Sequence, residues 1–89
     1  MQERRAIPRG TTLRQTIQTR VALGDGTILT GAVKDMSCQG AAIVGETRGL
    51  DVGRRITVAF LLPAGGQVTY TCEVRHVEPG SGFGVRYVQ

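Results

Sequence analysis

Two arginines near the start of the chain, Arg5 and Arg9, carry the side chains best suited to binding an anion. A guanidinium group offers bidentate hydrogen bonds to phosphate oxygens, or to O6 and N7 of guanine, and a flat face for stacking. Because Pro8 favours extended backbone at Ile7, the two side chains sit on a short, non-helical arm. If the arm folds back, both can converge on one anionic ligand; a solvated basic tail is the alternative.

A second polar motif, Asp-x-Ser-x-x-Gly over residues 35–40, follows an expected strand. Asp35 can accept hydrogen bonds from the N1–H and N2–H₂ edge of a guanine, and Ser37 can donate one to a phosphate. Gly40 permits a positive φ or a close approach of backbone to a ligand. A plain tight turn is the alternative, because Asp and Ser side chains also bond to backbone two residues further on.

The net charge of +4, from 11 Lys and Arg against 7 Asp and Glu, is concentrated at one end of the chain. Residues 1–20 hold five arginines against Glu3 alone, and the basic and acidic residues of the remainder cancel. A basic segment of this kind indicates a partner rich in phosphate, a nucleic acid or an anionic membrane surface.

The sequence shows no recognisable arrangement of catalytic or metal-binding residues. A single histidine, His76, cannot form a metal cluster, and Ser37 has no histidine near it in the sequence. Two cysteines are too few for a disulfide framework or a cysteine zinc site, so Cys72 is expected as a buried thiol and Cys38 as a partly exposed one. We therefore expect a binding module with no catalytic activity, metal or resident cofactor.

Targeting signals do not stand out in the chain. The longest apolar run is far shorter than a membrane span, and the basic N-terminus lacks the apolar stretch of a signal peptide. A cytoplasmic location is expected, either free or as the cytoplasmic domain of a larger, membrane-associated protein.

Apolar and polar residues alternate with period two through most of the chain, and no segment keeps a helical period. This pattern predicts six strands, over residues 16–23, 27–34, 41–44, 54–62, 67–77 and 82–88. Because turn residues separate these short strands, the pattern predicts an all-β fold, a six-stranded antiparallel β-barrel or a tightly rolled sandwich. The barrel would cover residues 13–89 and a flexible N-terminal arm residues 1–12 of one domain.

The alternation also predicts which side chains face the core. His76 shares the phase of Tyr70 and Cys72, so a structural role is expected for it. The aromatic residues all fall in the core phase: Phe60, Tyr70, Phe83 and Tyr87. Arg75 and Arg86 are out of phase with the core and would extend a site only if their strands lie beside the 35–40 motif.

Taken together, the two motifs resemble the PilZ domain family over essentially the whole chain. The resemblance rests on Arg-x-x-x-Arg before the first strand and Asp-x-Ser-x-x-Gly after the second, in that order. Leu61-Leu62-Pro63 at a strand end and the closing Gly84-Val85-Arg86-Tyr87 are also common in that family. The resemblance implies a small β-barrel that binds the bacterial second messenger cyclic di-GMP.

The same resemblance implies roles for the motif residues. Arg5 and Arg9 would grip guanine and phosphate groups, and Asp35, Ser37 and Gly40 would line the barrel side of the site. A basic residue just before the arginine motif, here Arg4, is associated in this family with a stacked, intercalated pair of cyclic di-GMP molecules. We therefore expect Arg4 to contribute and two ligands to bind each domain.

The expected function is signal reception, in which the ligand draws the arm onto the barrel and changes its orientation towards a fused or separate effector protein. The extent of the chain fits a stand-alone adaptor or a fragment of a larger effector, such as a polysaccharide synthase subunit or a motility regulator. One alternative is a nucleic-acid-binding barrel of the OB type, disfavoured because every aromatic residue is in the core phase. Another is a PilZ-like protein-interaction domain without a nucleotide ligand, disfavoured by the intact motif positions.

Overall fold

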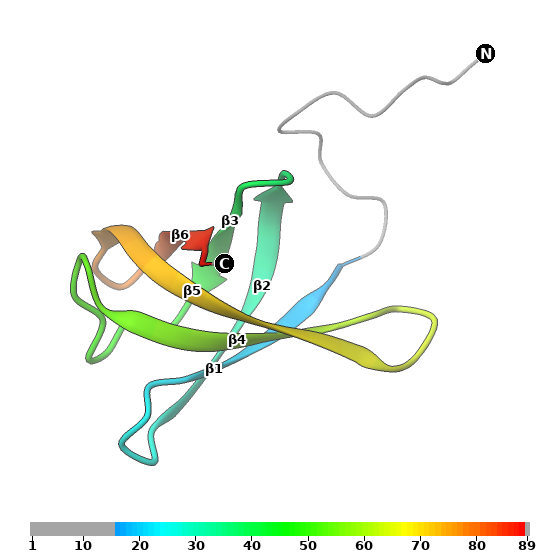
Figure 1. The fold of residues 1–89 in the computed structure, drawn as a ribbon, viewed down its shortest axis with the longest axis horizontal. Coiled ribbons are helices and arrows are strands. Elements are labelled where there is room, and N and C mark those ends of the chain that lie inside the picture. Colours follow the sequence, from blue (N-terminus) through cyan, green and yellow to red (C-terminus); the bar gives the residue numbers. More distant parts are fainter. Residues whose placement is uncertain (1–15, 89) are drawn as a thin grey trace.

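Residues 16–88, which the computed structural model describes, form six β-strands joined into one closed barrel (Figure 1). The strands are β1 Gln18–Ala22, β2 Ile28–Met36, β3 Gly40–Gly45, β4 Arg55–Leu61, β5 Gln67–Glu78 and β6 Gly82–Tyr87. They follow one another around the barrel in the order β1-β2-β3-β6-β5-β4, and every neighbouring pair is antiparallel. The predicted six-stranded antiparallel barrel is confirmed. No helix occurs in this part of the chain, and so none that could cross a membrane.

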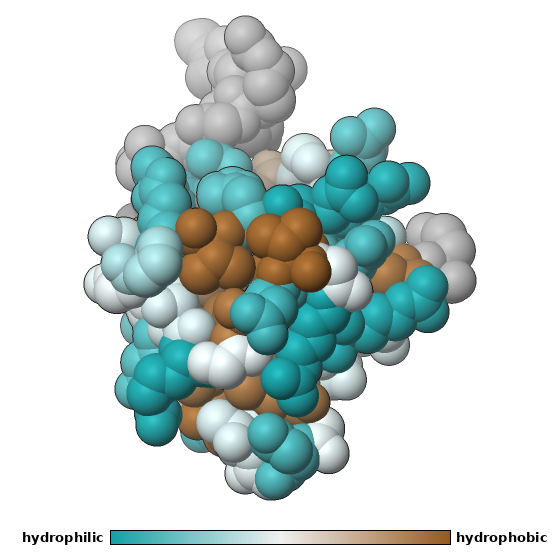
Figure 2. All heavy atoms as spheres, turned by 90° about the vertical axis from the view of Figure 1, so that its left-hand side faces the viewer, coloured by the Kyte–Doolittle hydropathy of each residue, from teal (hydrophilic) through white to brown (hydrophobic). Residues whose placement is uncertain are grey.

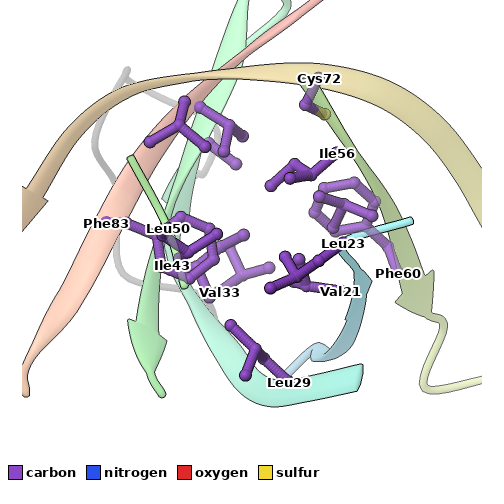
Figure 3. Close-up of a cluster of buried hydrophobic side chains, with 14 residues drawn as sticks. Val21, Leu23, Leu29, Val33, Ile43, Leu50, Ile56, Phe60, Cys72 and Phe83 are labelled. Atoms are coloured by element: carbon purple, nitrogen blue, oxygen red, sulfur yellow. The ribbon is translucent and has the colours of Figure 1, made fainter. Parts of the chain in front are cut away.

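The interior of the barrel is filled by the apolar residues that alternate along the strands. Figure 3 shows Ile43, Ile56 and Phe60 pointing into the same space from β3 and β4. The buried apolar residues are Val21, Leu23, Leu29, Val33, Ala41, Ile43, Leu50, Ile56, Val58, Phe60, Cys72, Val74, Phe83 and Val85. Alternation along a strand sends successive side chains to opposite faces, which is why period two was sufficient to predict most of this set.

The two cysteines lie in opposite environments, as predicted: Cys72 is fully buried and Cys38 is exposed. Burial disfavours the thiolate and raises the pKa of Cys72 to about 11. A thiol reagent applied to the folded chain at mildly alkaline pH should therefore titrate one thiol, and both after unfolding in guanidinium chloride. Cys38→Ser should abolish the fast reaction and Cys72→Ser should leave it unchanged; rapid reaction of both thiols in the folded chain would contradict this assignment.

Two β-bulges interrupt the strict alternation of the strands. Between β2 and β3 the register shifts at Lys34, and beyond the bulge β2 continues to Met36, two residues past its predicted end. Between β5 and β6 the register shifts at Arg75. Because one extra residue reverses which side chains point outward, His76 is exposed on the outer surface. The prediction that His76 belongs to the core is wrong for this reason.

The β4–β5 hairpin reaches past the wall of the barrel (Figure 1). Strand β6 pairs with β5 only as far as Cys72, so Val68 and Tyr70 lie beyond the barrel and are 40% and 45% exposed. Their predicted place in the core is wrong. Tyr70 stacks on Tyr87 with ring centroids 4.8 Å apart, and both rings meet Phe60 edge-on. A partly exposed aromatic pair is thus present, which removes the argument raised against a nucleic-acid-binding barrel.

Candidate functional site

A groove of about 340 Å³, open to solvent, lies on the outer surface across β2, β3, β6 and β5. The motif of residues 35–40 forms one side of it, and side chains of β5 and β6 form the other. Its lining residues are Asp35, Ser37, Gln39, Gly40, Ala41, Ala42, Arg75, His76, Gly84, Val85 and Arg86. Strands from both halves of the sequence therefore meet in one concave surface, which is the candidate site.

The motif combines the end of β2 with a tight turn. Asp35 is the residue directly after the bulge and is half-buried, whereas Ser37 is exposed in the turn. The Ser37 N–H donates to the Gly40 carbonyl at 2.9 Å, and the Gln39 N–H donates to Ser37 Oγ at 3.1 Å. Since Ser37 Oγ accepts a hydrogen bond from the turn, its own proton stays available for a ligand. The turn role and the binding role of this motif are therefore compatible.

The floor of the groove is built from small residues. Across the sheet, Asp35 pairs with Ala42, Ala42 with Gly84, and Gly84 with His76. These four positions form one row over β2, β3, β6 and β5, with the two small residues in the middle. Because the methyl group of Ala42 hardly projects from the sheet, a flat ligand can approach the backbone there, between Asp35 and the His76 ring that covers Gly84.

Two arginines of the last strands also line the groove, Arg75 at the β5 bulge and Arg86 opposite Gly40 on β6. Arg75 is paired with Glu73 at 3.6 Å but remains largely exposed. Sequence alternation had placed both side chains outward without locating them. What locates them is the pairing of β3 with β6, which no turn signal in the sequence indicates.

The structure brings Asp35, Ser37 and Gly40 together in the groove. The other predicted binding residues, Arg4, Arg5 and Arg9, and the predicted arm over residues 1–12, lie outside the described residues. Sequence reasoning did not assign His76 to the site, and it left Arg75 and Arg86 dependent on where their strands lie; all three line the groove. For His76 the missing signal was the bulge, because period-two reasoning assumes an uninterrupted strand.

The outer surface also exposes some apolar side chains, among them Val44 and Val52. Figure 2 shows that on the face it presents, apolar residues occur in small groups with hydrophilic residues around and between them. This face therefore offers no continuous apolar patch that would favour a protein-docking function over ligand binding.

Fold and groove together define a small all-β barrel with a ligand-sized outer site. The family model for the PilZ domain matches residues 3–89, and the chain belongs to this family, a family of cyclic di-GMP receptors. The chain is also similar to a solved structure described as the PilZ domain of CeSA from a cellulose-synthesizing bacterium. That similarity has a TM-score of 0.69 and 23% sequence identity, and it covers 86% of this chain and 80% of the other. No curated protein matches the chain.

Proposed function

We propose that this PilZ domain binds cyclic di-GMP between the N-terminal segment 1–12 and the groove on a barrel formed by residues 13–89. Arg5 and Arg9 grip the phosphates and a guanine from one side. Asp35 and Ser37 bind from the other, at a backbone approach that Gly40 leaves open. The observation that carries the proposal is the convergence of these three motif residues with two further arginines on one groove.

The charges around the groove suit the two ends of such a ligand. Arg75 and Arg86 supply positive charge on the β5–β6 side, where charge-assisted hydrogen bonds to phosphate are the strong kind. Asp35 supplies the acceptor that a guanine edge needs, at the opposite end of the row through Ala42 and Gly84. A ligand with both guanine and phosphate groups therefore matches the groove better than a simple anion.

The start of β1 lies close to the motif. The Ile17 carbonyl accepts a hydrogen bond from the Val33 N–H at 2.9 Å, two residues before Asp35 along β2. From Ile17 back to Arg9 is eight residues, which can span at most about 26–29 Å. The arginine motif is thus within reach of the groove. Ligand binding would draw this segment onto the barrel, and the resulting change in its orientation is the signal passed to a fused or separate effector protein.

Room for more than one ligand supports the proposed role of Arg4. A second hollow of about 450 Å³, lined by Cys38, Gln39, Arg86 and Tyr87, adjoins the groove at Gln39 and Arg86. Two stacked cyclic di-GMP molecules carry four phosphates, for which Arg4 provides an additional cation and stacking face. We propose an intercalated ligand pair in each domain, and a role in signalling rather than in chemistry.

Calorimetric titration of the purified chain with cyclic di-GMP tests the proposal, with GTP and cyclic di-AMP as controls. The expected result is saturable binding of cyclic di-GMP alone, at two ligands per chain, and at one in Arg4→Ala. Absence of heat with cyclic di-GMP would refute the proposed function, and a one-to-one ratio in the unsubstituted chain would refute the ligand pair. Tight, steeply salt-dependent binding of single-stranded oligonucleotides would favour a nucleic-acid-binding barrel instead.

A further inference from the structure

The β5 bulge has a specific effect on His76. In an uninterrupted strand the imidazole would point into the barrel with Cys72 and Val74; with the bulge at Arg75 it lines the groove. Bulges occur preferentially next to functional sites, where they redirect a side chain. The bulge therefore places the His76 imidazole in the groove.

Gly84 provides the space in which this ring lies. A Cβ atom at Gly84 would be 2.5 Å from His76 Cε1 and 2.7 Å from Nδ1, so the imidazole occupies the volume that any other residue would fill. The ring thus lies low against β6, level with the floor of the groove. Within residues 16–88, no hydrogen bond involves the imidazole. It is held by packing and leaves its exposed side to the groove.

The orientation of the His76 ring decides what part of a ligand it can meet. The backbones of Asp35 and His76 are three strand spacings apart in the row through Ala42 and Gly84, about 14 Å along the sheet, and the imidazole reaches back over Gly84, one spacing nearer to Asp35. Asp35 binds a guanine by its edge, whereas a ring packed against the floor offers its face. With one guanine edge held by Asp35, the imidazole is suited to stack on the other guanine of the ligand.

We propose that His76 is a stacking residue for a second purine base in the groove, at the end opposite Asp35. The proposal rests on the proposed function, since cyclic di-GMP supplies two guanines per molecule. An exposed, flat ring beside Arg75 combines a stacking surface with a cation for the adjacent phosphate. The small side chain of Ala42 leaves room for the base beside the ring that covers Gly84.

Substitutions at His76 separate stacking from a merely structural role. His76→Ala should weaken cyclic di-GMP binding about 10-fold, the range found for loss of one base–aromatic stack, and His76→Phe should bind within about threefold of the unsubstituted chain. Thr69→Ala, on the exposed part of β5 outside the groove, is the matched control and should change nothing. Equal affinity of His76→Ala and the unsubstituted chain, or equal losses in the Ala and Phe variants, would overturn the proposal.

Tryptophan fluorescence gives a second readout, because the chain contains no tryptophan. The indole of His76→Trp should be quenched by cyclic di-GMP, since a stacked guanine quenches indole emission. Val52→Trp, in the exposed loop after β3, should not respond. Quenching with the first ligand equivalent assigns the base to the molecule held by Asp35, and quenching with the second assigns it to the other ligand.

The two proposals fail in different ways. If the unsubstituted chain does not bind cyclic di-GMP, the proposed function is wrong. If it binds while His76→Trp stays unquenched and His76→Ala binds normally, the function stands and the stacking role of His76 is wrong.

Discussion

Arg9→Ala and Asp35→Asn are each expected to weaken cyclic di-GMP binding at least about 100-fold. A hydrogen bond to a charged group contributes about 1.5–3 kcal/mol, and each of these side chains can make two, so loss of a pair exceeds the roughly 2.7 kcal/mol that corresponds to 100-fold. Asparagine keeps the shape of Asp35 but turns an amide N–H₂ towards the donors of the guanine edge. Calorimetry on the two single variants and on the double variant measures both effects.

Matched controls are available on the same fold. Arg20→Ala removes an exposed arginine on the outer face of β1, and Asp51→Asn removes an exposed carboxylate in the loop after β3. Both should bind as the unsubstituted chain does. If Arg20→Ala weakened binding as much as Arg9→Ala, the arginines would act only through net charge and the specific grip proposed for Arg9 would be refuted.

Gly40→Ala is expected to destabilise the barrel strongly, by about 3 kcal/mol, the upper part of the range for overpacking. A Cβ atom at Gly40 would collide with the Val85 carbonyl oxygen and lie 3.0 Å from its carbonyl carbon, both in the backbone of β6. Neither atom can move without opening the pairing of β3 with β6. Thermal unfolding should show a fall in Tm of about 12–24 °C for a domain of this size.

Gly84→Ala is the informative comparison, because both glycines line the same groove. The added Cβ at Gly84 meets only the imidazole of His76, a side chain that can swing away. We therefore expect a small change in Tm and, by displacement of the ring, a loss of affinity. A Tm for Gly40→Ala close to that of Gly84→Ala would show that Gly40 serves the ligand alone.

That comparison bears on how well the sequence predicted the site. The motif pointed to Gly40 as a ligand-lining glycine, and the groove does include it. Its tightest neighbour, however, is the strand β6, more than forty residues away in the sequence. A requirement imposed by a distant backbone leaves no local signal, so the structural role of Gly40 was not predictable from the motif.

The alternation of apolar and polar residues predicted burial reliably wherever a strand was regular and lay within the barrel wall. It predicted the inward position of Ile56, Val58 and Phe60 on β4. It was wrong for His76, where the bulge reverses the pattern. It was also wrong for Tyr70, where the alternation continues along β5 past the point at which β6 stops pairing with it. In both cases the local sequence looks like an ordinary strand, and only the register with a neighbouring strand decides the outcome.

The closure of the barrel also has a consequence for folding kinetics. Four of the six strand pairs are hairpins between consecutive strands, whereas β1–β4 and β3–β6 join distant parts of the chain. Non-local pairs close large loops and form slowly. The groove spans the β3–β6 junction, with Asp35 on one side and His76 on the other. Half-formed sheets therefore contain no site, and a ligand that binds the groove stabilises only the completed barrel.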